Sequence, residues 1–442
     1  MPALELDDIQ SGVLRPRPVP FAATYIILRI DDRAAGRELM RRLSSAVASA
    51  ANPESPTRDT WVSASLTASG LRALGVPQAS LDTFPTPFVQ GMAARAERLG
   101  DVGESSPEHW EKPLGTCDVH VVITAVSTSE AQLHPAVERA KAALHELPGV
   151  EAIWRQDCGV QKDEKEPFGF KDGISHPAIE GSGVPGTNPN EIPLKAGEFV
   201  LGYPDEMSKG EVPIIPQPDV LSRNGSFIVF RKLHQRVAAF RQYLKANAAD
   251  AADEELIAAK MMGRWRSGAP LALSPDADRP QIGADPALNN NFLFNADDAI
   301  GYKTPLGSHI RRMNPRDANI AGVMRIHRMI RRGSGYGPPL PEGVLEDDGA
   351  DRGLMFAFVG ANLGRQFEFV QSEWMNDGAF FGDGKERDPV SGAGDGEGTY
   401  NIPRRPLRRQ LKGLSRFVIT RGGEYCFLPS LSALRWLSEL RD

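Results

Sequence analysis

The sequence is poor in features that would place it in several large classes of protein. Its 442 residues include only three cysteines, Cys117, Cys158 and Cys426, whose spacing fits neither a disulfide framework nor a zinc site. No apolar run approaches the roughly 20 residues that a membrane span requires. The N-terminal stretch MPALELDDIQ has no charged region followed by an apolar core. We therefore expect no secretory signal and a cytoplasmic protein with reduced thiols.

An excess of positive charge is also missing. Lys and Arg number 51 against 57 Asp and Glu, giving a formal net charge of −6, which argues against a nucleic-acid-binding protein. The arginines are nevertheless dense at 311–332 and at 404–409. Such local clusters favour either a small anionic ligand or a solvated face.

Length and apolar patterning predict an α+β fold in two domains, 1–200 and 201–442. In the first half the order of elements is β-α-β followed by β-α-β, which is typical of a ferredoxin-like sandwich, an antiparallel sheet with helices on one face. The second half has a similar order, which suggests two copies of one architecture. The expected strands are 23–30, 61–67, 117–126, 150–156, 225–233, 354–361 and 416–421; the expected helices include 34–50, 129–147 and 430–441; and 367–375 has an ambiguous period.

Three motifs in the long loops carry candidate chemistry. In PFGFKDGISHPAIEG, Gly169 and Gly173 bracket Asp172 and would present its carboxylate on a tight loop. In GSHIRRMNPRD, His309 stands beside arginines that disfavour a charged imidazole, which leaves a ring nitrogen free for a metal. In RIHRMIRRGSGYG, Arg331 precedes a glycine-rich turn. Each motif also has an ordinary reading: an aspartate turn, a core histidine, and a basic helix end with its C-cap glycine.

Taken together, the motifs resemble one family. GFKDG is similar to the GxxDG motif of the dye-decolorising peroxidases, GSHIRRMNPRD to their proximal-histidine segment, and HRMIRRG to the segment that carries their distal arginine. LELDDIQSGVL and TRGGEYCFLPSLSALRWL resemble the opening and closing segments of that family. The similarity spans essentially the whole chain. It departs at Ser11, where a glycine is usual, and at KTPLGSH, where many members have Cys-Pro.

The resemblance implies a duplicated ferredoxin-like fold of the dimeric chlorite-dismutase type, with one haem b per chain ligated axially by His309. It implies that Asp388 holds the ring of His309 and that Arg311 contacts a haem propionate, with Arg312 pointing elsewhere if the segment is extended. It also implies that Asp172 is the distal base, that Arg331 stabilises developing charge, and that a ferryl porphyrin-radical species forms.

The implied activity is reduction of hydrogen peroxide with one-electron oxidation of donors such as anthraquinone dyes and phenols. Leu354 and Phe356 resemble walls of the distal pocket, and an ordinary core is an equal alternative for both. Surface radicals on Tyr336, Trp374 or Tyr400 could carry electrons from bulky donors. The long insertions are similar to those of the larger, cytoplasmic members, the chain stops at SELRD with no extended tail, and a homodimer is left open.

Two competing interpretations follow from the same residues. A haem carrier or iron-releasing enzyme would need His309 but not the pair of Asp172 and Arg331. An anion-binding or interaction protein would use the arginine clusters and no iron, and would stay colourless when haem is supplied. The presence of both Asp172 and Arg331 favours the peroxidase.

Overall fold

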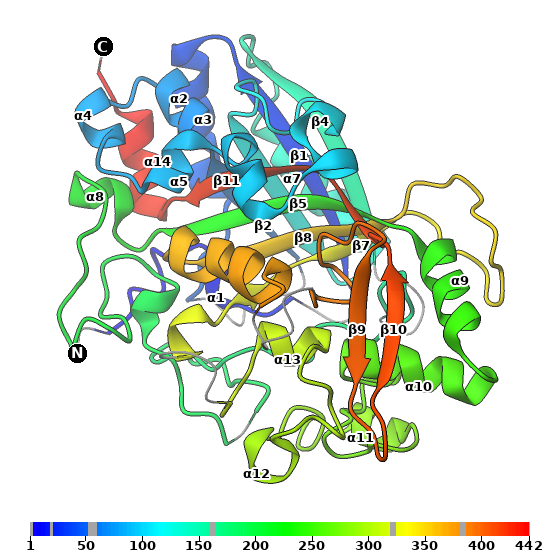
Figure 1. Ribbon diagram of the computed structural model, residues 1–442. Coiled ribbons are helices and arrows are strands. Elements are labelled where there is room, and N and C mark those ends of the chain that lie inside the picture. Colours follow the sequence, from blue (N-terminus) through cyan, green and yellow to red (C-terminus); the bar gives the residue numbers. More distant parts are fainter. Residues whose placement is uncertain are drawn as a thin grey trace.

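One antiparallel sheet runs through the molecule and joins both halves of the chain (Figure 1). The computed structural model describes residues 3–17, 21–51, 60–159, 165–188, 190–318, 324–379 and 386–441. The strand order is β4-β1-β3-β2-β11-β5-β8-β6, with β7 also paired to β8. The strands are β1 (Ala22–Ile30), β2 (Thr60–Leu66), β3 (Val121–Ser127), β4 (Val150–Gly159), β5 (Ser226–Gln235), β6 (Ile330–Arg331), β7 (Ser334–Tyr336), β8 (Gly353–Gly360) and β11 (Val418–Leu428).

The strand order contains the same arrangement twice. Across the first half of the sheet, the strands lie side by side in the order β4-β1-β3-β2, that is, the fourth, first, third and second strands of that half of the chain. In the second half, β5, β6, β8 and β11 repeat this arrangement, since the sheet there reads β11-β5-β8-β6. This is the strand order of a ferredoxin-like sandwich, so the duplicated antiparallel fold expected from the sequence is confirmed.

Helices cover one face of the sheet. They include α2 (Arg33–Ala46), α7 (Glu130–Ala142) and α14 (Leu431–Ser438). Helix α2 begins where the Asp32 carboxylate accepts a hydrogen bond from Ala35 N at 2.7 Å, and it ends earlier than the apolar spacing predicts. The N-cap Ser430 starts α14 in the same way.

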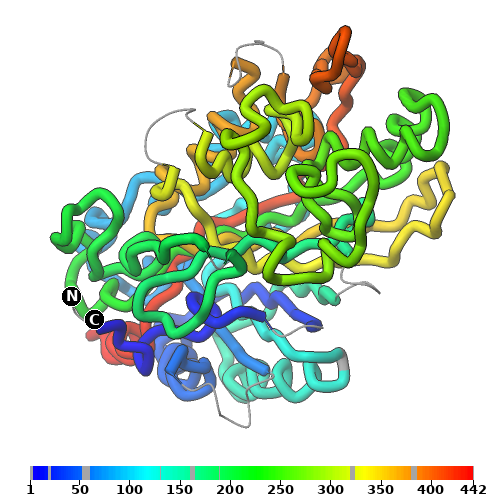
Figure 2. The backbone as a smooth tube through the Cα atoms, turned by 90° about the horizontal axis from the view of Figure 1, so that it is seen from below, coloured from blue at the N-terminus to red at the C-terminus, as the bar shows by residue number. Residues whose placement is uncertain are grey.

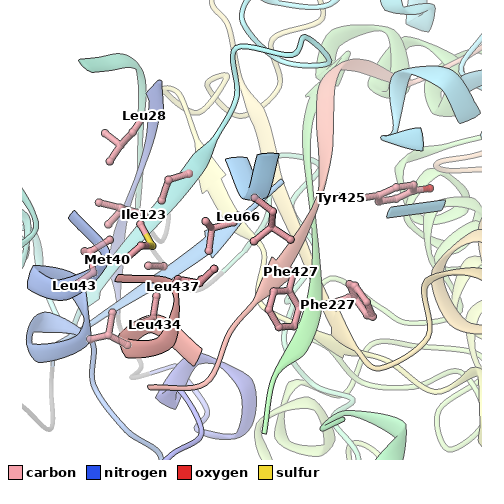
Figure 3. Close-up of a cluster of buried hydrophobic side chains, with 14 of the residues drawn as sticks. Leu28, Met40, Leu43, Leu66, Ile123, Phe227, Tyr425, Phe427, Leu434 and Leu437 are labelled. Atoms are coloured by element: carbon pink, nitrogen blue, oxygen red, sulfur yellow. The ribbon is translucent and has the colours of Figure 1, made fainter. Parts of the chain in front are cut away.

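Two apolar cores lie on the two faces of the sheet. The helix-covered core includes Leu39 and Leu43 of α2 and Leu434 and Leu437 of α14, and Figure 3 shows these helices packed over the strands. The core on the opposite face lies beneath the N-terminal segment and residues 194–203. Because strand side chains alternate between faces, Met355 and Ala357 of β8 enter this second core.

The two halves of the sheet meet at a seam between β2 and β11. The ladder there contains one register pair, Leu66 with Phe427, whereas β2 and β3 are paired along seven positions. Helix α14 crosses the seam and packs against α2 (Figure 1). The helix-covered core is therefore continuous across the seam, and the division of the chain at residue 200 stays a prediction.

Long excursions from the second half of the sheet build one end of the molecule. Figure 2 views the molecule from the side where the segments between β5 and β6 lie. Residues 367–375, whose apolar spacing fitted neither a strand nor an α-helix clearly, fall in π-helical turns. Between β5 and β6 lie α9 (Val237–Asn247), α10 (Ala251–Met262), α11 (Pro280–Ala284), α12 (Asn295–Asp298) and α13 (His309–Met313). Between β8 and β11 lie the π-helical η7 (Leu363–Glu368) and η8 (Val370–Asn376) and the hairpin of β9 (Gly398–Ile402) and β10 (Arg409–Leu414).

Short helical turns complete the described part of the chain. They are α1 (Ser11–Leu14), α3 (Ala68–Ala73), α4 (Gln78–Leu81), α5 (Thr86–Gln90), α6 (Ala96–Leu99), α8 (Asp219–Ser222) and the 3-10 turns η1 (Ala93–Arg95), η2 (Gly103–Ser105), η3 (Pro107–His109), η5 (Ala196–Glu198) and η6 (Met324–His327). Within the described ranges, no helix has the length and apolar character needed to cross a bilayer.

We expect Phe427→Ala to destabilise the protein strongly. The ring is fully buried at the seam, with centroids 5.3 Å from Phe84 and 6.0 Å from Phe227, and its loss leaves a cavity. Substitutions of this kind cost about 3–5 kcal/mol, which urea denaturation followed by tryptophan fluorescence would measure. Leu407→Ala, at a side chain that is 76% exposed, is the control and should change stability by less than about 0.5 kcal/mol. Equal effects of the two substitutions would contradict this account of the seam.

Candidate functional site

A large cavity lies where the second half of the sheet meets the excursions. Its volume is about 270 Å³, against about 30 Å³ for the second cavity described below. Side chains from β5, β6, β8, β11, α13, η8 and the loop 166–175 line it. They include Asp172, His309, Arg331, Leu354, Phe356, Met375, Val390 and Thr420. The cavity thus brings together the three motifs that are far apart in the sequence.

The loop that presents Asp172 is held by a buried carboxylate. Glu166 accepts hydrogen bonds from Phe168 N at 3.0 Å and from Phe170 N at 2.9 Å, which closes the loop on itself. Gly169 and Gly173 have φ values of +94° and +79°, in the region that favours glycine. This backbone fixes Asp172 on the cavity wall, as the glycine spacing predicts.

Asp172 faces Arg331 across the cavity. Asp172 Oδ1 lies 3.6 Å from Arg331 Nη1, and the two side chains are 39% and 35% exposed toward the open space. Burial acts to raise the pKa of Asp172, but Arg331, Arg17 and the Gly173 N–H together outweigh it, and the pKa is lowered from its usual value of 3.8. The carboxylate is therefore ionised over a wide acidic range and able to accept a proton.

His309 begins helix α13 and lines the cavity on another side. Its Nδ1 donates to Asp388 Oδ2 at 2.8 Å, and Asp388 is fully buried. Asp388 Oδ1 also accepts hydrogen bonds from the backbone N–H groups of Val390 and Ser391, at 2.9 and 2.8 Å. Burial would raise the pKa of Asp388, but His309 and these N–H groups lower it. The ionised carboxylate orients the ring and leaves Nε2 as the free nitrogen.

The structure does not bring Arg311 to the cavity. Its side chain is fully buried, with Nη1 donating to Thr304 O at 2.7 Å and Nη2 donating to Asp298 O at 2.9 Å. The prediction chose Arg311 by its place in the motif and turned Arg312 elsewhere only if the segment were extended, whereas His309–Met313 is helical. A helix puts positions 309 and 313 on one face and position 311 on the opposite side. Arg312 is likewise buried, and it donates to Trp374 O at 2.8 Å.

Arg264 and Arg316 also line the cavity, and sequence reasoning missed both. Arg316 Nη1 donates to Phe292 O at 2.7 Å, and Arg264 Nη1 donates to Gly268 O at 3.0 Å. Burial lowers the pKa of Arg316 to about 10, and burial with the nearby Arg316 lowers that of Arg264 to about 9. Among the described residues neither guanidinium has a carboxylate partner. The NPRD continuation of the histidine motif was a usable signal for Arg316, but GRWRSG gave none for Arg264.

The remaining expectations have different outcomes. Leu354 and Phe356 alternate on β8 and both line the cavity, and Phe356 also packs against the helix-covered core. Tyr336, Trp374 and Tyr400 are 3%, 2% and 0% exposed. None of the three is therefore a surface site: Tyr336 and Tyr400 lie in apolar cores, and the Trp374 ring packs against His327 and Phe369. Their role as electron relays stays a prediction.

Comparison with known proteins agrees with this geometry. Residues 8–151 match the DyP dimeric alpha+beta barrel domain. Peroxidase 2 of Mycetinis scorodonius is 32% identical to the chain over 406 residues, which cover 85% of the chain and 76% of that protein. The chain belongs to the dye-decolorising peroxidase family. It is also 30% identical to the multifunctional dye peroxidase DyP2 of Amycolatopsis sp., across 98% of the chain and 96% of that enzyme.

Solved structures of dye-decolorising peroxidases have the same fold. A complex of a dye-decolorising peroxidase with 2,6-dimethoxyphenol superposes with a TM-score of 0.85 at 27% identity, covering 98% of this chain and all of that one. An ancestral D-type enzyme gives a TM-score of 0.84 at 29% identity, covering 98% and 99% of the two chains. The present chain is therefore a peroxidase of this family, with its fold preserved over nearly the whole length.

We expect Arg331→Leu to move the acid limit of the peroxide reaction to higher pH. The substitution removes the largest group that lowers the pKa of Asp172 and leaves the burial that raises it. The parent should react with peroxide at pH values below the usual aspartate pKa of 3.8, and the variant should lose its base at a higher pH. Rapid-mixing measurements from pH 3 to 8 would locate the limit. Arg435→Leu, which removes an exposed guanidinium from α14, should leave it in place; an unchanged or lower limit in Arg331→Leu would contradict the assignment.

Proposed function

We propose that this peroxidase holds one haem b in the large cavity, where His309 Nε2 would ligate the iron. A ring nitrogen that faces the cavity and an ionised Asp388 behind the ring support this assignment. In the described part of the chain, no group of three or more His, Cys, Asp or Glu side chains lies close enough together to hold a metal ion. A single protein nitrogen suits a metal that brings most of its own ligands, as haem iron does.

Arg264 and Arg316 suit the propionates of such a group, because both line the cavity and neither pairs with a carboxylate among the described residues. A buried guanidinium is costly unless an anion accompanies it, and Arg264 and Arg316 have only carbonyl and amide oxygens around them. We assign the propionate contacts to these residues in place of Arg311. The positive charge of these two arginines is thus of the sign that the propionates of haem would offset.

Two side chains would act directly on hydrogen peroxide. Asp172, kept ionised by Arg331 and Arg17, accepts the proton of the inner peroxide oxygen and delivers it to the outer one, which leaves as water. Arg331, 3.6 Å away, stabilises the negative charge that develops as the O–O bond breaks. When bound, haem supplies the redox centre that takes two oxidising equivalents from peroxide and returns them singly to donors.

We further propose phenols and anthraquinone dyes as electron donors. One relative was crystallised with 2,6-dimethoxyphenol, and Leu354 and Phe356 give the cavity of this chain an apolar wall. Small phenols suit such a wall, while larger dyes would have to react at the surface. Since Tyr336, Trp374 and Tyr400 are buried, any of them would serve only as an internal step on such a path.

The proposed location is the cytoplasm. Cys117, Cys158 and Cys426 are all free thiols, one exposed and two buried. An exposed free cysteine is most compatible with a reducing compartment. Fractionation of the host cells would test this proposal.

The absorption spectrum of protein expressed with a haem supply tests the proposal. We expect a Soret band in the parent that is lost in His309→Ala and retained in Asp172→Asn. In Asp172→Asn the band should respond to one equivalent of peroxide roughly 10²–10⁴-fold more slowly. His145→Ala, at an exposed histidine, is the matched control and should behave as the parent. Retention of the band in His309→Ala would contradict the assignment of His309 as the iron ligand. Normal peroxide reactivity in Asp172→Asn would contradict the role of Asp172 as the base.

A second variant tests the propionate contacts. Arg316→Met should release haem to an acceptor such as apomyoglobin roughly 10- to 100-fold faster than the parent, because a charge-assisted hydrogen bond is lost. Arg435→Met removes the same charge from the exposed face of α14 and should have no effect on the release rate. Equal release from both variants would contradict the role of Arg316.

A further inference from the structure

A second cavity lies on the other face of the sheet, behind the catalytic pair. Successive residues of the segment that contains β6 point to opposite faces, so Arg331 lines the large cavity and Arg332 lines the small one. The small cavity lies between the N-terminal segment and the sheet. Its walls include Gly12, Arg17, Ser63, Ser65 and Arg332, together with apolar side chains of the core on that face.

Two guanidinium groups share this small cavity without an acid between them. Arg17 Nη1 donates to Ser334 Oγ at 3.3 Å and stacks over Phe21 at 4.0 Å, and Arg332 Nε donates only weakly to Gly12 O at 3.4 Å. Neither forms an ion pair with any residue in the described ranges. Burial lowers the pKa of both groups, and Arg17 lowers that of Arg332 further, to about 9. Two desolvated like charges that repel each other require a counter-charge.

A buried hydroxyl points to the same place. Ser63 is 7% exposed, its Oγ has no hydrogen-bond partner, and it lines the cavity beside Gly12. A Cβ on Gly12 would lie 2.6 Å from this oxygen, so the hydroxyl occupies the space that a side chain at position 12 would take. Buried hydroxyl groups are nearly always hydrogen-bonded, so this one is available to donate to a bound acceptor.

The size of the cavity limits what the acceptor can be. A space of about 30 Å³ holds one or two particles the size of a water molecule, since one water requires about 10–15 Å³ measured in this way. Phosphate and sulfate are too large. A monatomic anion fits, and it would satisfy the two guanidinium groups and the hydroxyl together.

We propose that the small cavity is a binding site for one monatomic anion, chloride in solution, held by Arg17, Arg332 and Ser63 Oγ. The anion would clamp the N-terminal segment to the strand that carries Arg331. It would also place a negative charge on the far side of the sheet from Asp172. None of its three ligands lines the large cavity, so binding of the anion can be tested separately from binding of haem.

Anomalous diffraction on unmodified crystals soaked in sodium bromide tests the site directly. We expect a bromide peak within hydrogen-bond distance of the guanidinium groups of Arg17 and Arg332 and of Ser63 Oγ. Water density without an anomalous signal at this position would overturn the proposal. Bromide in the large cavity would be seen separately and would not count as support.

The stability of the holoenzyme in solution gives an independent reading. At constant ionic strength, replacing sodium gluconate by sodium chloride should raise the Tm of the parent. The rise in Tm should be lost in Arg332→Met and reduced in Ser63→Ala. The second substitution removes only a hydroxyl group, so we expect the variant to fold. Arg435→Met, which removes an exposed charge, should retain the full rise. The same chloride effect in all variants would assign it to another site and overturn the proposal.

Discussion

The two-residue period of the antiparallel strands is the constraint on which the site depends. On β8 it sends Leu354 and Phe356 into the large cavity while Met355 and Ala357 complete the opposite core. At β6 it separates two adjacent arginines, one for each face. A shift of register by one residue would exchange these faces, removing Arg331 from Asp172 and placing apolar side chains where the reaction needs charge. The long ladder between β5 and β8, paired at eight positions, prevents that shift.

Charged side chains on different sides of the cavity keep both carboxylates of the site ionised. On one side, Asp388 is buried and ionised and holds the ring of His309. On the other, Asp172 is kept ionised by arginines on both faces of the sheet, of which Arg331 lines the large cavity and Arg17 does not. Arg264 and Arg316 add positive charge that the described protein does not neutralise. The proposed haem propionates would offset this positive charge.

The sequence predicted those features that depend on short segments. Gly169 and Gly173 shape the Asp172 loop locally, and the repeated order of strands is visible in the apolar runs. Arg311 was assigned wrongly because one residue of rotation around a helix changes which side chain faces the cavity, and motif similarity did not specify whether the segment was helical. Arg264 could not be found at all, since it reaches the cavity only through the packing of α10 against the loops that follow it. The buried positions of Tyr336, Trp374 and Tyr400 likewise depend on contacts between distant segments.

The seam between the halves has a consequence for the order of assembly during synthesis. Among the described residues, only Leu66 and Phe427 pair across it, so side chains, more than a backbone ladder, join the two copies of the fold. The helix that covers α2 is α14, which the ribosome makes after every strand of the sheet. The first copy therefore emerges with part of its apolar surface uncovered and completes its core only when the second copy delivers α14. We therefore expect the two copies to fold cooperatively, although each has a full set of strands.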